Sequence, residues 1–104
     1  MTNYKVIIEP VAANDLAGIV DYISKVLLEP TVAAKLYRNI KEQISSLSNM
    51  PKRNKIVSDE RYASVGLRTL MMKNYIAYYI VDDHDNTVHI IRVLYNRREW
   101  QDIL

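Results

Sequence analysis

Three strand-like runs follow one another closely in the last third of the chain, and this arrangement limits the folds that the sequence can adopt. They are residues 66–72, 75–82 and 87–95. Each run is rich in β-branched and aromatic residues, which favour strands. Only Lys73-Asn74 separates the first two runs, and a short polar segment separates the last two. Because joints this short connect neighbouring antiparallel strands, we predict an antiparallel meander.

The first half of the chain has a different pattern, because its apolar residues recur at helical spacing. After a strand-like run over residues 4–8, one apolar stripe covers about residues 11–28 and a second extends from Ala33 to Leu47. Pro30 lies between the stripes, and the residue before a proline is pushed out of the helical conformation. We therefore predict two amphipathic helices joined by a short corner, which favours an antiparallel pair.

Together these patterns predict an α+β fold with the element order β-α-α-β-β-β in a single domain, residues 1–104. Two amphipathic helices need a sheet face against which to bury their stripes, so we expect a helix hairpin on one face of a small antiparallel sheet. In the last strand the period of two places Ile90, Arg92 and Leu94 on one side, which we expect to be the open side. Residues 49–63 show no periodicity and are expected to form a connection without structure of its own.

Composition excludes several kinds of site. The chain has no Cys, which excludes disulfides and thiolate metal sites, and its two glycines exclude a dinucleotide-binding fold. It has no nucleophile elbow, glycine-rich phosphate loop or zinc motif. Asp82, Asp83, His84 and Asp85 could bind a cation, but a polar hairpin turn is the simpler explanation, because Asp and Asn favour turns. We expect neither a metal nor a cofactor.

The sequence also indicates where the protein acts. No apolar run approaches the roughly 20 residues of a membrane helix, so we expect no membrane partner. The N-terminal residues enter a strand-like run without the apolar segment of a secretory signal. With the absence of Cys, this favours the cytoplasm.

Cationic and aromatic side chains gather toward the C-terminal end. The net charge is only +2, and the surplus lies in the second half of the chain. Arginine binds phosphate or carboxylate through a planar fork, and tyrosine or tryptophan provides a stacking platform or an anchor. The candidate binding residues, expected to converge at one end of the sheet, are Arg68, Lys73, Arg92, Tyr95, Arg97, Arg98 and Trp100. The alternative is that Arg97 and Arg98 are solvated charges at the end of the sheet, paired with Glu99 and Asp102.

The same residues leave a catalytic alternative open. A metal-free ribonuclease needs a base for the 2′-hydroxyl proton, a cation for the charged phosphorane and an acid for the leaving oxygen. In that alternative Arg68, Arg92 and Arg97 would bind the phosphate, and Tyr95 or His89 would transfer protons.

Five segments occur in order along almost the whole chain. They are Ala13-x-Asp15-Leu16-x-x-Ile19-x-x-Tyr22-Ile23, Leu47-x-x-x-Pro51, Gly66-Leu67-Arg68, Tyr75-x-x-x-Tyr79-x-Val81 and Ile90-Ile91-Arg92-Val93-Leu94-Tyr95-Asn96-Arg97-Arg98. In order and spacing they resemble the RelE/ParE superfamily of toxins from type II toxin–antitoxin systems. The resemblance implies a helix hairpin on a small antiparallel sheet, in agreement with the patterns above.

The resemblance implies two different activities. RelE-like members cut mRNA on the ribosome with Lys and Arg on the sheet and a C-terminal Tyr or His, whereas ParE-like members poison DNA gyrase. This chain has Ile76 where RelE relatives place an Arg, and no His near its C-terminus, although Arg97 could match a RelE arginine. We therefore favour a ParE-like toxin that binds gyrase without catalysis. The alternatives are a RelE-like ribonuclease and a non-toxic binding domain.

The resemblance also implies a cognate antitoxin and hence a toxin–antitoxin hetero-oligomer. Such a partner would cover the surface of the toxin with an extended or helical segment that supplies acidic and apolar groups and folds on binding.

Overall fold

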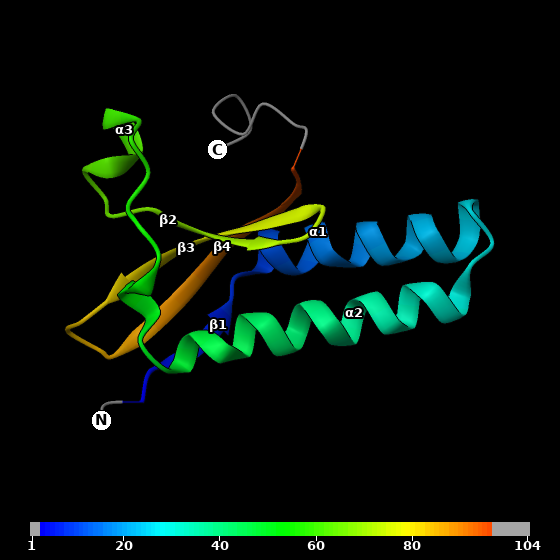
Figure 1. Cartoon of the computed structure of the whole chain (residues 1–104), viewed down its shortest axis with the longest axis horizontal. Coiled ribbons are helices and arrows are strands. Elements are labelled where there is room, and N and C mark those ends of the chain that lie inside the picture. Colours follow the sequence, from blue (N-terminus) through cyan, green and yellow to red (C-terminus); the bar gives the residue numbers. More distant parts are fainter. Residues whose placement is uncertain (1–2, 97–104) are drawn as a thin grey trace.

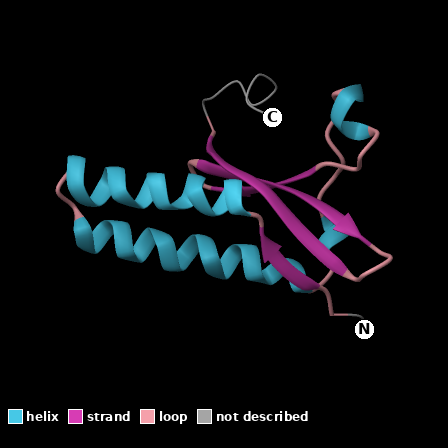
Figure 2. Cartoon of the chain, turned by 180° about the vertical axis from the view of Figure 1, so that it is seen from behind, coloured by secondary structure: helices cyan, strands magenta, loops and turns pink. Residues whose placement is uncertain are grey.

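The computed structural model describes residues 3–96 of the chain. In chain order the elements are β1 (Lys5–Ile8), α1 (Pro10–Asp21), the π-helix η1 (Tyr22–Val26), α2 (Pro30–Ser45), the 3₁₀ turns η2 (Ser46–Ser48) and η3 (Pro51–Arg53), the short helix α3 (Glu60–Ala63), β2 (Arg68–Met72), β3 (Tyr75–Asp82) and β4 (Thr87–Tyr95). Figures 1 and 2 show the helix hairpin on one side of the sheet and projecting beyond its end. The predicted α+β fold, with a helix hairpin on a small sheet, is confirmed.

The four strands form one sheet in the order β1-β4-β3-β2. The three C-terminal strands pair antiparallel, which confirms the predicted meander. The first strand lies parallel to β4, with Lys5 opposite Thr87 and Ile8 opposite Ile90, so the sheet as a whole is mixed. The parallel orientation arises because the chain crosses over through the helix hairpin before it returns to the sheet.

A β-bulge in β4 changes which side chains share a face. The register with β3 shifts so that Ile90 and Arg92 lie opposite consecutive residues, which leaves Ile91 as the extra residue. The extra residue reverses the alternation, and Ile90 and Val93 both belong to the core beneath the helices. The prediction that Ile90, Arg92 and Leu94 share an open side is therefore wrong, because a strict period of two does not continue through a bulge.

The main core lies between the helix hairpin and the sheet. Its buried side chains come from the predicted apolar stripes of both helices and from one face of the sheet, and they include Leu16, Ile40, Ile44, Leu47, Tyr79, Val88, Ile90 and Val93. Burial of each large apolar side chain contributes about 1.5–3 kcal/mol. The helix hairpin is thus held on the sheet by the two stripes that the sequence predicts.

The opposite face of the sheet is covered in part, contrary to the prediction of an open cationic face. Leu67, Tyr78 and Leu94 are buried there, and Val57 and Tyr62 pack against them. The covering segment contains η3 and α3, so the expected structureless connection is also wrong. The physical reason is that the second face is apolar as well, and covering it removes apolar surface from water.

Tyr79 fastens the start of this covering segment to the core. Its ring is fully buried, its hydroxyl donates to the Pro51 carbonyl at 2.7 Å, and the Asn54 side-chain amide donates to the same hydroxyl at 3.1 Å. Burial raises the pKa of Tyr79, so the hydroxyl stays protonated and able to donate.

Replacing Tyr79 with Phe tests this attachment. Tyr79→Phe should lower the free energy of unfolding by about 1–2 kcal/mol, because the Pro51 carbonyl and the Asn54 amide lose their partner. Urea denaturation measures the change, with Tyr37→Phe as the matched control because Tyr37 is 41% exposed. Equal stability of the two variants would contradict the proposed role of the hydroxyl.

Candidate functional site

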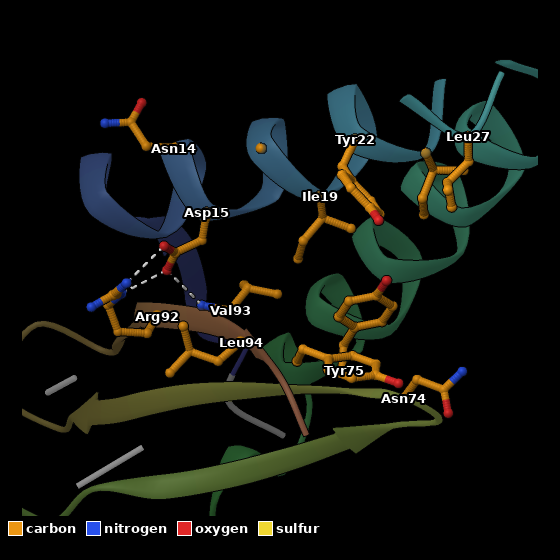
Figure 3. A pocket seen from close by; sticks show the side chains of 13 residues that line it. Asn14, Asp15, Ile19, Tyr22, Leu27, Asn74, Tyr75, Arg92, Val93 and Leu94 are labelled. Carbon is orange, nitrogen blue, oxygen red and sulfur yellow. Dashed lines mark hydrogen bonds and ion pairs between the residues drawn. The ribbon is translucent and has the colours of Figure 1, made fainter. Parts of the chain in front are cut away.

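A groove of about 750 Å³ lies between the first helix and one end of the sheet. Figure 3 shows side chains of α1 and η1 facing those of the β2–β3 turn and of β4 across this space. The apolar and aromatic lining consists of Ile19, Tyr22, Ile23, Leu27, Tyr75, Val93, Leu94 and Tyr95. A concave apolar surface of this size is typical of a binding site.

The groove exists because β1 is shorter than the strand it pairs with. β1 ends at Ile8, opposite Ile90, and the chain then enters α1. β4 continues to Tyr95. Past Ile90, the part of the chain described by the structure supplies no strand on this side of β4, and α1 lies over the gap.

Asp15 joins α1 to the end of β4 at the floor of the groove. One carboxylate oxygen accepts hydrogen bonds from Arg92 Nε at 2.6 Å and from the Val93 N–H at 3.1 Å. The other accepts from Arg92 Nη2 at 2.8 Å (Figure 3). The hydrogen bond with Asp15 raises the pKa of Arg92 above its usual value and so favours the charged guanidinium. Arg92 and Asp15 thus act as a brace between helix and strand.

Two tyrosines form the aromatic side of the groove. The rings of Tyr75 and Tyr95 meet edge to face, with centroids 5.6 Å apart and an interplanar angle of 61°. Tyr95 is 41% exposed, and Tyr22 across the groove is 55% exposed. Burial raises the pKa of Tyr75, which keeps its hydroxyl neutral. These rings offer apolar area with a polar edge, which suits a protein partner.

The apolar surface continues from the groove to the tip of the helix hairpin. Val26, Leu27, Leu28 and Val32 are all more than half exposed there. The tip includes the π-helix η1, in which Leu27 N–H bonds to the Tyr22 carbonyl, and Leu28 has a left-handed φ of 55°. A left-handed leucine costs about 1–2 kcal/mol. Exposed apolar side chains grouped in this way indicate a contact surface for another protein.

The structure brings together only some of the predicted binding residues. Lys73 lies in the β2–β3 turn, and Arg92 and Tyr95 line the groove near it. Arg68 lies opposite Tyr79, about 13 Å along the strand from the Tyr75 end of the groove. Arg68 does not line the groove with Arg92 and Tyr95, and its guanidinium bonds the Asn54 carbonyl. Arg97, Arg98 and Trp100 lie outside the described residues.

Arg68 and its cationic neighbours instead hold the segment that follows α2. Arg68 Nη1 donates to the Asn54 carbonyl at 2.6 Å. Lys52 pairs with Asp83, which also accepts a hydrogen bond from the Tyr4 hydroxyl at 2.8 Å. The hydrogen bonds from Lys52 and Tyr4 lower the pKa of Asp83. These contacts hold the segment after α2 in place. Arg68 takes part in them by donating to a backbone carbonyl.

His89, the other candidate for proton transfer, lies on the β1 side of β4. Its Nδ1 is 2.7 Å from Glu9 Oε1, and it lies opposite Ile7 in the sheet register. Arg68 is in β2, at the opposite edge of the sheet. His89 and Arg68 thus do not lie together, whereas Tyr95 and Arg92 both line the groove.

Sequence reasoning missed most of the groove lining, including Asp15, Gly18 and Tyr22. Asp15 and Tyr22 lie within the helical segment that resembles the RelE/ParE superfamily, which was the available signal. Gly18 lines the groove on α1, and a Cβ there would meet no atom within 4 Å. Its absence of a side chain leaves part of the groove empty.

Within residues 3–96, no group of three or more His, Asp or Glu side chains is placed to hold a metal ion. The helices of that same range include none that is long and apolar enough to cross a membrane.

A helix hairpin on a four-stranded mixed sheet, with a groove beside the last strand, defines a toxin domain of the RelE/ParE fold. A family profile described as "ParE toxin of type II toxin-antitoxin system, parDE" matches residues 6–100. The chain therefore belongs to the ParE toxin family of type II toxin–antitoxin systems, and the resemblance noted in the sequence is confirmed. A search of curated proteins by sequence found no match.

Solved structures support the same assignment. The chain is similar to a protein of the chromosomal ParDE toxin–antitoxin system from P. aeruginosa, with a TM-score of 0.74, 25% identity and coverage of 91% of this chain and 98% of that one. Two further structures show the same fold. One is the RelBE2 toxin–antitoxin complex of Mycobacterium tuberculosis, with a TM-score of 0.65, 24% identity and coverage of 94% and 97%. The other is a mutant of E. coli toxin RelE in the free state, with a TM-score of 0.65, 13% identity and coverage of 98% and 99%.

Removing the Asp15 carboxylate tests the brace. Asp15→Ala should lower the free energy of unfolding by about 2–4 kcal/mol, because it leaves the partly buried Arg92 guanidinium and the Val93 N–H without this acceptor. Asp15→Asn retains a carbonyl oxygen and should lose clearly less. Chemical denaturation of both variants measures the difference, and an Asp15→Ala variant as stable as the parent would refute the brace.

Proposed function

We propose that the protein is a ParE-like toxin that arrests growth by binding DNA gyrase in the cytoplasm, and that a cognate antitoxin silences it by covering the groove. The observation that carries this proposal is the continuous apolar surface from the groove to the hairpin tip. It includes Tyr22, Leu27 and Tyr95, which are more than two-fifths exposed. A surface of this chemistry supports binding to protein more than binding to nucleic acid.

The separation of the candidate catalytic groups supports a binding poison over a ribonuclease. A general base, a general acid and a phosphate-binding cation must all lie within hydrogen-bond reach of one substrate. Arg68, in β2, donates a hydrogen bond to the Asn54 carbonyl. His89 contacts Glu9 on the β1 side of the sheet, and Tyr95 packs on Tyr75 at the groove. Arg68 and His89 placed in this way cannot serve one scissile phosphate together with Tyr95 without rearrangement, which leaves Arg92, Arg97 and Tyr95 as the candidate groups of a ribonuclease.

The proposed partner is supported by the chemistry of the groove and by the ParDE relative. An exposed apolar groove is unfavourable in water, and a partner that covers it gains the free energy of its burial. The similar P. aeruginosa protein belongs to a ParDE toxin–antitoxin system. We therefore infer a hetero-oligomer of this toxin with the antitoxin encoded beside it.

Controlled expression in bacteria tests the function. The chain is induced alone or with the product of the adjacent small reading frame, while plasmid supercoiling and mRNA integrity are followed. We expect growth arrest with altered DNA topology and intact transcripts, and recovery when the adjacent product is present. Normal growth would contradict a toxin in that host, and codon-phased mRNA cuts would replace gyrase binding with ribosome-dependent cleavage.

Two arginines that follow β4 are the predicted contacts with gyrase. Arg97→Ala combined with Arg98→Ala should reduce toxicity at least tenfold in a plating assay, because the two positive charges proposed to contact gyrase are lost. Lys35→Ala with Arg38→Ala is the matched control, since it removes the same charge from the exposed side of α2. Full toxicity of a folded Arg97/Arg98 double variant would show that gyrase contacts a different surface.

A further inference from the structure

The tip of the helix hairpin presents apolar side chains to water. Its four residues Val26, Leu27, Leu28 and Val32 are between 51% and 77% exposed. Leu28 has the largest exposed fraction of any large hydrophobic residue in the described part of the chain. Apolar surface left in water adds no stability to the free toxin, so these side chains are not explained by the packing of the fold.

The backbone at Leu28 is strained. The chain turns out of η1 there, with Leu27 N–H bonded to the Tyr22 carbonyl and Glu29 N–H bonded to the Ile23 carbonyl, both at 3.0 Å. The turn requires the left-handed φ of 55° at Leu28, a position that glycine usually occupies at a helix end. A strained residue whose side chain is mostly in water is typical of a functional position, as is a short π-helix.

The charges beside the tip are balanced. Asp21 and Lys25 form an ion pair at 3.8 Å. Glu29 lies at the corner, and Lys35, of opposite charge, lies in the second turn of α2. Nucleic acid and anionic membranes are attracted by an excess of positive charge, which this surface lacks. The charge pattern therefore favours an apolar protein surface as the partner.

The shape of the hairpin indicates what kind of protein surface fits it. Figures 1 and 2 show the two helices projecting beyond the end of the sheet, so the tip is a narrow projection. Two such projections would meet over a small area, whereas a specific interface buries roughly 800 Å² of each partner. A cleft surrounds a projection on several sides and buries more of it. The shape thus favours a concave partner over a second copy of this chain.

We propose that the hairpin tip inserts into an apolar cleft of the target protein, with Leu28 as the central side chain. This inference rests on the proposed function, which takes DNA gyrase as the target, and it specifies which part of the toxin enters gyrase. Leu27 belongs to both the tip and the groove lining. An antitoxin that covers the groove therefore also restricts access to the tip.

Replacing Leu28 with Gly tests the contact with gyrase. Leu28→Gly should weaken binding to purified DNA gyrase by about tenfold or more, because the complex no longer buries the leucine side chain. Met50→Gly is the matched control, since Met50 is 69% exposed and also has a left-handed φ, of 48°. Met50 follows the far end of α2, whose 16 residues extend over about 24 Å. Calorimetric titration measures both affinities, and equal binding by the two variants would overturn the inference.

The stability of the variants separates a lost contact from a damaged fold. Both glycine variants should be at least as stable to urea as the parent, because glycine adopts a positive φ without strain and each lost side chain is exposed. Leu28→Asn provides a second variant, since asparagine also tolerates the left-handed conformation and is polar. It should lose gyrase binding as Leu28→Gly does, and full binding by a folded Leu28→Asn variant would contradict the proposal.

Binding of the antitoxin separates the tip from the groove. Leu28 does not line the groove, so Leu28→Gly should bind the product of the adjacent small reading frame within about twofold of the parent. An equal loss of both partners would refute a separate role for the tip. If the parent chain does not bind gyrase, the proposed target is wrong. The tip then fails as well only if Leu28→Gly arrests growth as strongly as Met50→Gly.

Discussion

The contacts of Asp15 determine how α1 lies relative to the end of β4, and the groove depends on them. One carboxylate accepts the Arg92 guanidinium and the Val93 N–H, so charge-assisted hydrogen bonds join a helix to a strand edge. Asp15 bonds a backbone group on the side of β4 that β1 occupies up to Ile8. The Asp15 side chain occupies less space along this edge of β4 than a paired strand would, and the space that remains is the groove.

The long helices and the strands could be predicted because the period of the apolar residues indicates which face of each element is buried. The two apolar stripes correspond to α1 with η1 and to α2. The bulge at Ile91 could not be predicted, since Ile90, Ile91 and Arg92 all suit a regular strand and nothing in them marks an extra residue. The cover on the second sheet face was missed because its apolar residues, such as Val57 and Tyr62, are too widely spaced to show a period.

The candidate site could be predicted less well, because it depends on contacts between distant parts of the chain. Composition pointed to the end of the sheet, where Arg92 and Tyr95 line the groove and Lys73 precedes Asn74 of its lining. The position of Arg68 outside the groove lining could not be predicted, because it depends on the strand register and on the contact with Asn54. The Asp15–Arg92 pair spans 77 residues of sequence, and a carboxylate on an amphipathic helix gives no sign of its partner.

An unpaired strand edge beside an apolar groove invites self-association, which a free toxin must limit. Here the available edge is short, and the Asp15–Arg92 brace blocks its beginning, because the Val93 N–H is already bonded. The contacts of Asp15 therefore take one backbone donor of this edge out of reach of a second copy. The ion pair that braces the fold thus also limits self-association through the strand edge.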